Sequence, residues 1–220
     1  MNKNIVVFDL DDTLYKEIDF LISGYHYIAA FLKEKYRLSD VFSLMLKSYF
    51  DKQNVFQELN KNFGLDISIR EYLEMYRNHF PKIQLDVETK ETLSLLNQKK
   101  NVIFGLITDG REITQRNKIV ALGIDNWIKN ENIIISETFG SEKPTLENYL
   151  YFQKKYGEAD CYYVGDNLNK DFITPNKLNW TTICLLDNGK NVHKQDFKLS
   201  KEYLPQFIMS NIKALLKIIY

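Results

Sequence analysis

The apolar positions of this chain follow two different periods, and the change between them divides the sequence. Residues 5–8 form a continuous apolar run, rich in β-branched side chains, that is typical of a strand buried on both faces of a parallel sheet. From residue 16 to about residue 80 the apolar positions recur every three or four residues instead, as they do on amphipathic helices. After Pro81, short apolar runs and helical patterns alternate. The pattern therefore predicts a helical block between the first strand and an alternating remainder.

The helical block carries its own boundary signals. Ser39 is expected to cap a second helix, a third is expected to end at Gly64, and Ser68 with Glu71 forms the capping box of a fourth. Pro81 cannot continue that last helix. We therefore predict an all-helical insertion of about seventy residues, which is within the size range of a small domain.

Alternation of strands and helices in the remainder predicts a doubly wound parallel sheet, which is an α/β fold. Asp86 is expected to cap one helix, and Pro144 is expected at the first position of another. The expected strands span 102–108, 133–135, 162–164 and 181–186, and the expected helices span 87–98, 112–122, 144–156 and 208–219. The first strand is too apolar to stand alone, so it must join this sheet. We assign residues 1–15 and 85–220 to the α/β core and residues 16–84 to an inserted helical domain.

Composition narrows the class of protein. Hydrophobic residues make up 45% of the chain and charged residues 26%, which is ordinary for a soluble protein. Lys+Arg and Asp+Glu both number 29, so no charge excess favours a nucleic acid or an anionic membrane surface. The N-terminus lacks a signal-peptide pattern, and no apolar stretch is long enough to span a membrane. Cys161 and Cys184 lie in expected strands without metal-ligand spacing, so we expect reduced thiols in a cytoplasmic protein.

Three carboxylates, Asp9, Asp11 and Asp12, follow the first strand, with Thr13 next to them. The carboxyl end of a parallel strand is where open α/β sheets build their sites. Asp9 and Asp11 point the same way on an extended chain, and like charges so close raise each other's pKa unless a cation lies between them. Ligands that are all oxygen favour Mg²⁺. The alternative is an ordinary strand end with Asp12 or Thr13 as a helix cap.

Two further polar groups follow expected strands. Thr108, with Asp109 and Gly110, combines a hydroxyl with a glycine-containing turn of backbone N–H groups, which suits a phosphate oxygen. Lys143 precedes Pro144 at the mouth of an expected helix, where a cation opposes the helix dipole. A bound anion nearby would explain that lysine. An ordinary capping threonine and a solvated lysine are the alternatives for the two groups taken singly.

A fourth polar group, Asp166, Asn167 and Asp171, follows the expected strand 162–164. By itself it is equally typical of a loop with an N-capping aspartate. Taken together, the four groups place acids, a hydroxyl and a cation at the carboxyl ends of separate strands of one sheet. Such side chains converge on one crevice.

In this order and spacing, the four motifs resemble those of the haloacid dehalogenase superfamily, in its branch of phosphatases with a helical cap. The matching segments are residues 9–13, 108–110, 143–144 and 165–171, and the resemblance covers essentially the whole chain. It implies a Rossmann-like core in which the inserted helices form the cap domain. The first and fourth motifs are specific, whereas the middle two gain weight from their order and spacing.

The resemblance implies a role for each acid. Asp9 would be the nucleophile that forms an aspartyl-phosphate, and Asp11 would protonate the leaving oxygen and then take a proton from water. Asp9, the backbone carbonyl of Asp11 and Asp166 would hold Mg²⁺. Asp171, with Asn167 near it, would support the metal waters or orient the lysine. The phosphoryl oxygens would be bound by Thr108, Asp109, Gly110 and Lys143, of which Thr108 and Lys143 also count as catalytic.

The expected function is that of a Mg²⁺-dependent phosphatase acting on a small phosphorylated metabolite, such as a sugar phosphate or a nucleoside monophosphate. Asp11 favours this branch, because family dehalogenases lack the second acid. A phosphomutase would keep the same acids and stays open. A receiver-type signalling domain would need a phospho-acceptor at a later strand end, whereas Asp51 lies in a helical stretch. Intact Asp9 and Asp11 argue against a non-catalytic binding protein on this fold.

Substrate choice in this family depends largely on the cap, whose residues carry no transferable motif. The candidates to face the site are Tyr15, Lys16, Glu17, Phe20, Gln53, Asn54 and Phe56. For each one taken singly, an ordinary place in the hinge or on a helix surface is the favoured alternative.

Overall fold

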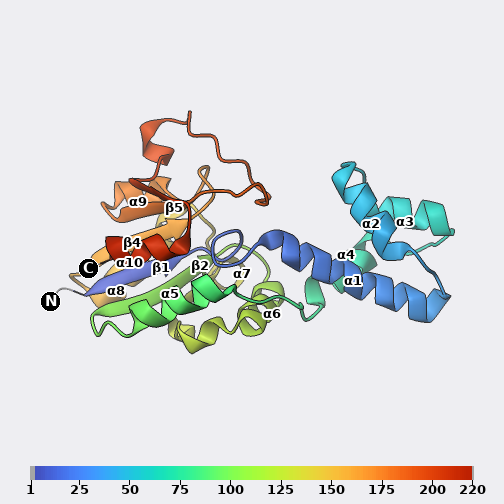
Figure 1. Ribbon diagram of the computed structural model, residues 1–220, viewed down its shortest axis with the longest axis horizontal. Coiled ribbons are helices and arrows are strands. Elements are labelled where there is room, and N and C mark those ends of the chain that lie inside the picture. Colours follow the sequence, from blue (N-terminus) through green and yellow to red (C-terminus); the bar gives the residue numbers. More distant parts are fainter. Residues whose placement is uncertain (1–2, 220) are drawn as a thin grey trace.

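The computed structural model describes residues 3–219 and shows an α/β core joined to a helical insert (Figure 1). The strands are β1 Asn4–Phe8, β2 Val102–Thr108, β3 Ile133–Ile135, β4 Asp160–Gly165, β5 Thr181–Leu185 and β6 Phe207–Met209. They form one sheet in the order β3-β2-β1-β4-β5-β6, and every neighbouring pair is parallel. This confirms the predicted α/β class and places β1 at the centre, between β2 and β4.

Both faces of the sheet are covered, which explains why β1 is apolar at every position. Val6 and Phe8 pack into one hydrophobic cluster, while Ile5 and Val7 pack into another on the opposite face. The first cluster is closed by α5 Val87–Asn97, α6 Glu112–Leu122 and α10 Leu215–Ile218. The second is closed by α8 Leu146–Tyr156, with the segment that leads into α9 Ile173–Lys177. A short helix, α7 Ser136–Phe139, follows β3. The polar strand ends therefore emerge from a packed core.

The insert consists of α1 Glu17–Tyr36, α2 Val41–Phe50, α3 Val55–Phe63 and α4 Ile69–Asn78. These helices lie beyond the carboxyl ends of the strands (Figure 1). Their interior is a separate hydrophobic cluster that includes Tyr25, Ile28, Leu32, Met45, Leu59 and Tyr72. The predicted helical insertion is therefore present, whereas the domain boundaries at 15/16 and 84/85 stay a prediction.

Several of the predicted helix boundaries are confirmed by side-chain hydrogen bonds. Both arms of the capping box form between Ser68 and Glu71 at the start of α4. The carboxylate of Asp86 accepts from the backbone N–H of Thr89 and caps α5. Gly64 ends α3 in the left-handed conformation that favours glycine.

Two predicted helix starts are wrong. The N-cap position of α2 is Asp40, whose side chain makes no capping hydrogen bond, and the hydroxyl of Ser39 donates to the Asp40 carboxylate instead of capping the helix. α8 begins at Leu146, so Pro144 precedes the helix instead of opening it. The reason lies one residue earlier, because the backbone N–H and the ammonium of Lys143 are both held in the core and keep this segment out of the helix.

The expected helix over residues 208–219 is also wrong. Phe207–Met209 forms β6, in which Phe207 faces Ile183 of β5, and a turn of 3₁₀-helix, Ile212–Ala214, precedes the short α10. A short apolar run does not by itself distinguish strand from helix. Here the apolar run forms an edge strand, because its backbone groups pair with those of β5. Of the predicted helix face, Ile212 and Leu215 are buried, whereas Ile208 is 53% exposed.

Within residues 3–219, no helix has both the length and the apolar character that a bilayer crossing requires.

Candidate active site

The carboxyl ends of β1, β2 and β4 surround a cavity of about 110 Å³. It is lined by Asp9, Asp11, Asp12, Glu17, Thr108, Asp109, Asp166, Asn167, Lys170 and His193. The structure thus brings together the predicted residues of the first, second and fourth motifs, and Lys143 and Asp171 lie buried beside them. Gly110 is not among the lining residues, and its backbone N–H donates to the Ser136 hydroxyl at 2.9 Å. Its part in phosphate binding stays a prediction.

Lys143 is a buried cation beside Asp9. Its Nζ donates to Asp9 Oδ1 at 2.5 Å and to Asp171 Oδ1 at 2.8 Å, and its backbone N–H donates to Asp109 Oδ1 at 3.0 Å. Burial alone lowers a lysine pKa, but the carboxylates of Asp171 and Asp9 hold the pKa of Lys143 well above its usual range. The lysine therefore stays charged at the side of Asp9.

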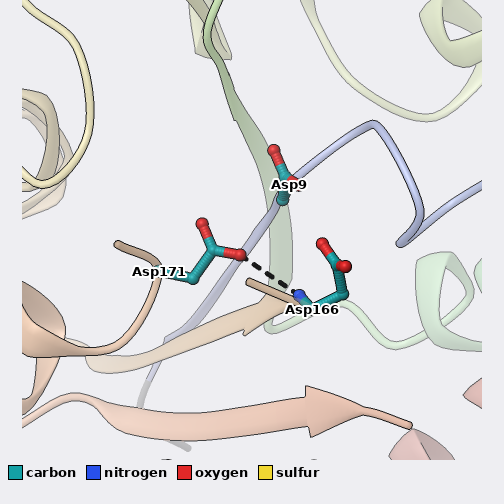
Figure 2. Close-up of side chains that lie close together, drawn as sticks. All are labelled: Asp9, Asp166 and Asp171. Carbon is teal, nitrogen blue, oxygen red and sulfur yellow. Dashed lines mark hydrogen bonds between the residues drawn. The ribbon is translucent and has the colours of Figure 1, made fainter. Parts of the chain in front are cut away.

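Asp171 holds the end of β4 in place. Its Oδ2 accepts from the backbone N–H of Asp166 at 3.1 Å (Figure 2). The same oxygen accepts from the backbone N–H of Asn167 at 2.8 Å, while Oδ1 accepts from Lys143. Gly165 permits this approach, because a Cβ there would lie 2.5 Å from Asp171 Oδ2. Although an oxygen of Asp171 lies near Asp9 and Asp166, both of its oxygens are already engaged. The arrangement fits a support for the loop and the lysine better than a metal ligand.

Asp9 and Asp166 are the carboxylates best suited to hold a cation. One oxygen of each lies within 4.8 Å of the other (Figure 2). Burial, with the charges of Asp171 and Asp11, raises the pKa of Asp9 to about 7 against the lowering by Lys143. Burial and the charges of Asp9 and Asp171 raise the pKa of Asp166 to about 9. Two buried carboxylates with raised pKa values fit a hard divalent cation, because it would relieve both the burial and the repulsion.

The carboxylate of Asp11 takes no part in this acidic pair. Its Oδ1 accepts from the Tyr15 hydroxyl at 2.5 Å and from Lys118 Nζ at 2.7 Å, and its Oδ2 accepts from Gln115 Nε2 at 3.0 Å. Burial raises the pKa of Asp11, but the Lys118 ammonium and these hydrogen bonds outweigh it and lower the pKa below its usual range. The two acids of the first motif therefore lie in different electrostatic environments.

Gln115 and Lys118 of α6 were not identified from the sequence. Gln115 Nε2 also contacts the Thr108 hydroxyl, so it links the end of β2 to Asp11. The Lys118 ammonium lies 4.5 Å from the ring centroid of Phe20 in α1. A signal was present, because both are polar residues three apart on the buried face of a helix. Buried polar groups at helical spacing need partners, and here the partner is the site.

A loop after β5 also reaches the site without any motif in the sequence. Asn191 Nδ2 donates to Asp166 Oδ2 at 2.8 Å, and Asn191 Oδ1 accepts from Lys16 Nζ at 2.7 Å. Nearby, the backbone N–H of Val192 donates to Asp12, whose other oxygen accepts from the N–H of Glu17. The loop therefore joins a carboxylate of the core to the first turn of the insert.

The candidate cap residues divide into two groups. Tyr15, Lys16, Glu17 and Phe20 lie at the site or contact its residues. The other three do not line the cavity: Asn54 caps α3, Phe56 stacks on Tyr72 at 4.9 Å inside the insert, and Gln53 is exposed. The insert thus meets the cavity through the start of α1.

Comparison with known sequences agrees with this geometry. A sequence model of the family described as "Haloacid dehalogenase-like hydrolase" matches residues 6–185. A curated relative, the glyceraldehyde 3-phosphate phosphatase of Methanocaldococcus jannaschii, is 28% identical over 214 residues, which cover 89% of this chain and 90% of the relative.

Solved structures share the fold over almost their whole length. HAD-hydrolase YfnB from Bacillus subtilis, bound to magnesium, superposes with a TM-score of 0.66 at 16% identity and covers 99% of both chains. 2-Haloacid dehalogenase from Pseudomonas syringae gives 0.65 at 19% identity, covering 99% of this chain and 98% of the other. HAD phosphatase from Thermococcus onnurineus gives 0.61 at 22% identity, covering 99% and 97%. The likeness to these solved structures shows a shared fold, whereas the match to the family model over residues 6–185 is a match of the sequence itself. Because that match covers well over half of the sequence, this chain belongs to the haloacid dehalogenase-like hydrolase family.

Proposed function

We propose that this hydrolase is a Mg²⁺-dependent phosphatase that acts on a small phosphorylated metabolite, such as a sugar phosphate or a nucleoside monophosphate, through an aspartyl-phosphate on Asp9. The observation that carries the proposal is the placement of Asp9. It lies at a strand end beside a buried lysine and the buried carboxylate of Asp166, with a further acid, Asp11, in the same small cavity. The relative that acts on glyceraldehyde 3-phosphate supports a small phosphorylated substrate.

In the first step a carboxylate oxygen of Asp9 bonds to phosphorus while the ester P–O bond breaks. Lys143 holds the other side of this carboxylate and fixes its direction. Asp9 and Asp166, with the backbone carbonyl of Asp11, would hold Mg²⁺, which neutralises charge on the phosphoryl oxygens. The hydroxyl of Thr108, at the end of the neighbouring strand β2, is the side-chain donor for a phosphoryl oxygen.

Asp11 moves the protons. It must enter the cycle protonated, although the Lys118 ammonium holds its pKa below the usual range. It gives that proton to the leaving oxygen as the alcohol departs, and then takes one from the water that attacks the aspartyl-phosphate and releases inorganic phosphate. Tyr15, Lys118 and Gln115 hold this carboxylate in one orientation. Since uncatalysed hydrolysis of phosphate monoesters is among the slowest of reactions, positioning and charge neutralisation must supply most of the acceleration.

The test is release of inorganic phosphate from a panel of phosphorylated metabolites, with and without Mg²⁺. We expect Mg²⁺-dependent release from several small monoesters. Asp166→Asn should weaken the Mg²⁺ dependence and the activity together, whereas Asp196→Asn, on the exposed chain after β5, serves as the matched control. If none of the phosphates is hydrolysed in the presence of Mg²⁺, or if the metal titration of Asp166→Asn matches the wild type, the proposal is wrong. Transfer of the phosphate within the substrate, without release, would identify a phosphomutase.

A further inference from the structure

Glu17 is an acid of the cavity that the proposed chemistry does not use. It is the first residue of α1, and it lines the cavity together with Asp9 and Asp11. Its backbone N–H is held by Asp12, but among residues 3–219 its carboxylate has neither a hydrogen bond nor an ion pair. Burial and the neighbouring charge of Asp11 raise the pKa of Glu17 to about 7. A largely desolvated carboxylate without a hydrogen-bond partner in the protein is suited to accept a hydrogen bond from a ligand.

The position of Glu17 indicates which part of a substrate it meets. Asp11 is the proton donor, so the bridging oxygen of the ester must come close to it. The carboxylates of Asp11 and Glu17 line the same small cavity. We therefore expect the atoms just beyond the bridging oxygen, on the leaving group, to face the part of the cavity that Glu17 lines. An ionised carboxylate only accepts hydrogen bonds, so it favours a donor such as a hydroxyl.

The charge around the cavity excludes a second anion at that place. Six carboxylates line it, against the ammonium of Lys170 and the imidazole of His193. Lys170 pairs with Asp109 at 2.7 Å. The two buried ammonium groups at the site are also engaged, Lys118 by Asp11 and Lys143 by Asp9 and Asp171. A carboxylate on the leaving group would therefore meet Glu17 in a cavity whose lining lysine, among residues 3–219, is already paired with an acid.

We propose that Glu17 is a specificity-determining residue that selects phosphate esters bearing a hydroxyl on the carbon next to the ester carbon, and that rejects esters bearing a carboxylate there. This rests on the proposed phosphatase function and narrows its substrate to hydroxylated metabolites, the polyol and sugar phosphates.

Three two-carbon phosphates test the proposal, because they differ only at the relevant position: 2-hydroxyethyl phosphate, ethyl phosphate and 2-phosphoglycolate. The assays use saturating Mg²⁺ at pH 8, where Glu17 is mostly ionised. For the wild type we expect kcat/KM to be highest for 2-hydroxyethyl phosphate and lower by about 100-fold for 2-phosphoglycolate, since like charges in contact oppose binding strongly. Ethyl phosphate should fall between them.

Two variants assign the discrimination to Glu17. Glu17→Gln keeps an acceptor but removes the charge, so we expect the preference against 2-phosphoglycolate to shrink at least about tenfold. Glu17→Leu removes the acceptor as well, and should bring 2-hydroxyethyl phosphate and ethyl phosphate to nearly equal kcat/KM. Ratios within one variant cancel any general loss of activity. Glu34→Gln, at the exposed far end of the same helix, is the matched control and should keep the wild-type ratios.

Failure of this inference is distinct from failure of the phosphatase function. One outcome is that the wild type hydrolyses these esters with Mg²⁺ at equal kcat/KM for 2-phosphoglycolate and 2-hydroxyethyl phosphate. That result would keep the phosphatase function and overturn the role of Glu17 in substrate selection. Unchanged ratios in Glu17→Gln and Glu17→Leu would overturn the assignment to this residue. Absence of hydrolysis of every phosphate in the panel would contradict the phosphatase function itself.

Discussion

The core and the insert of this protein bury different kinds of side chain. In the core, the carboxyl ends of the strands hold the ionisable groups Asp9, Lys143, Asp166 and Asp171 away from water. The insert has an apolar interior of its own, and its ion pairs lie on the surface, as between Arg70 and Glu74. Buried charged side chains therefore lie at the candidate active site of the core. The insert can vary its surface without disturbing the acids, because within residues 3–219 it meets them through the first turn of α1 and the residues leading into it.

The difference in burial predicts very different costs for losing a cation. Lys143→Met leaves the carboxylates of Asp9 and Asp171 buried without their partner, which should lower the free energy of unfolding by about 3–5 kcal/mol and remove activity. Arg70→Met breaks an exposed pair in the insert and should cost at most about 0.5 kcal/mol. Urea unfolding of both variants in EDTA measures this contrast. Equal losses would mean that the core pair is not the more costly one to break.

The second prediction concerns the acid that lies between core and insert. Asp11→Asn should lower kcat for alkyl phosphates by about 10²- to 10⁴-fold, because the leaving oxygen loses its proton donor. The loss should be smaller for an aryl phosphate, whose leaving group needs less protonation. A control is Asp125→Asn, in the exposed turn after α6, which should leave both rates unchanged. Equal losses for aryl and alkyl phosphates would show that Asp11 is not the acid.

The third prediction tests whether the insert is stabilised by its own interior. Leu59 of α3 is fully buried in the cluster of the insert, so Leu59→Ala should cost about 2–5 kcal/mol. Hydrogen exchange should then accelerate in α1–α4, while amides of β1 and β4 keep their protection and Mg²⁺ titration is unchanged. Val7→Ala in β1 is the reciprocal variant, with loss of protection expected in the core. Equal loosening of strands and insert in Leu59→Ala would contradict separate interiors.

The last prediction is a dependence of stability on pH that has opposite signs in the two regions. The raised pKa values of Asp9 and Asp166, about 7 and about 9, mean that the folded metal-free core binds protons that the unfolded chain releases above its ordinary pKa near 3.8. The core therefore loses stability as pH rises towards 9. Burial of His79, between α4 and Lys82, lowers its pKa below 6.5, so the insert loses stability as pH falls through that value.

Calorimetry in EDTA from pH 5 to pH 9 measures both limbs of this dependence. We expect Asp166→Asn to flatten the loss of Tm at high pH, and Mg²⁺ to reverse that loss in the wild type, because a ligand that binds only the folded state stabilises it. His79→Gln should flatten the loss at low pH. A Tm that rises with pH up to 9 in metal-free protein would contradict the core half of the comparison.

The contrast between the regions also explains what the sequence could and could not predict. Strand ends followed by Asp9, Thr108 or Asp166 were recognisable because the sheet forces such ends into one crevice. The spacing of Lys118 with Gln115 on one helix face was a signal, but it did not identify Asp11 as the partner, which tertiary packing sets. Asn191 lies in a loop and belongs to no local pattern.

The same limit accounts for the error at the C-terminal end. Phe207–Met209 is apolar enough for a buried helix face or an edge strand. It forms a strand because its backbone pairs with that of β5. In the insert, by contrast, Ser68 and Gly64 signalled helix boundaries through contacts within a few residues, and those predictions were confirmed. Local signals were sufficient where the contacts are local.

The central claim is that Asp9, and no other acid of the cavity, is the nucleophile. The most direct measurement is rapid acid quench during turnover, followed by reduction of the acyl phosphate with borohydride and peptide mass spectrometry. We predict that residue 9 is converted to homoserine, that the adduct is absent in Asp9→Asn, and that it accumulates when Asp11→Asn slows its hydrolysis. An adduct on Asp11, Asp166 or any other residue, or turnover in Asp9→Asn, would contradict the account.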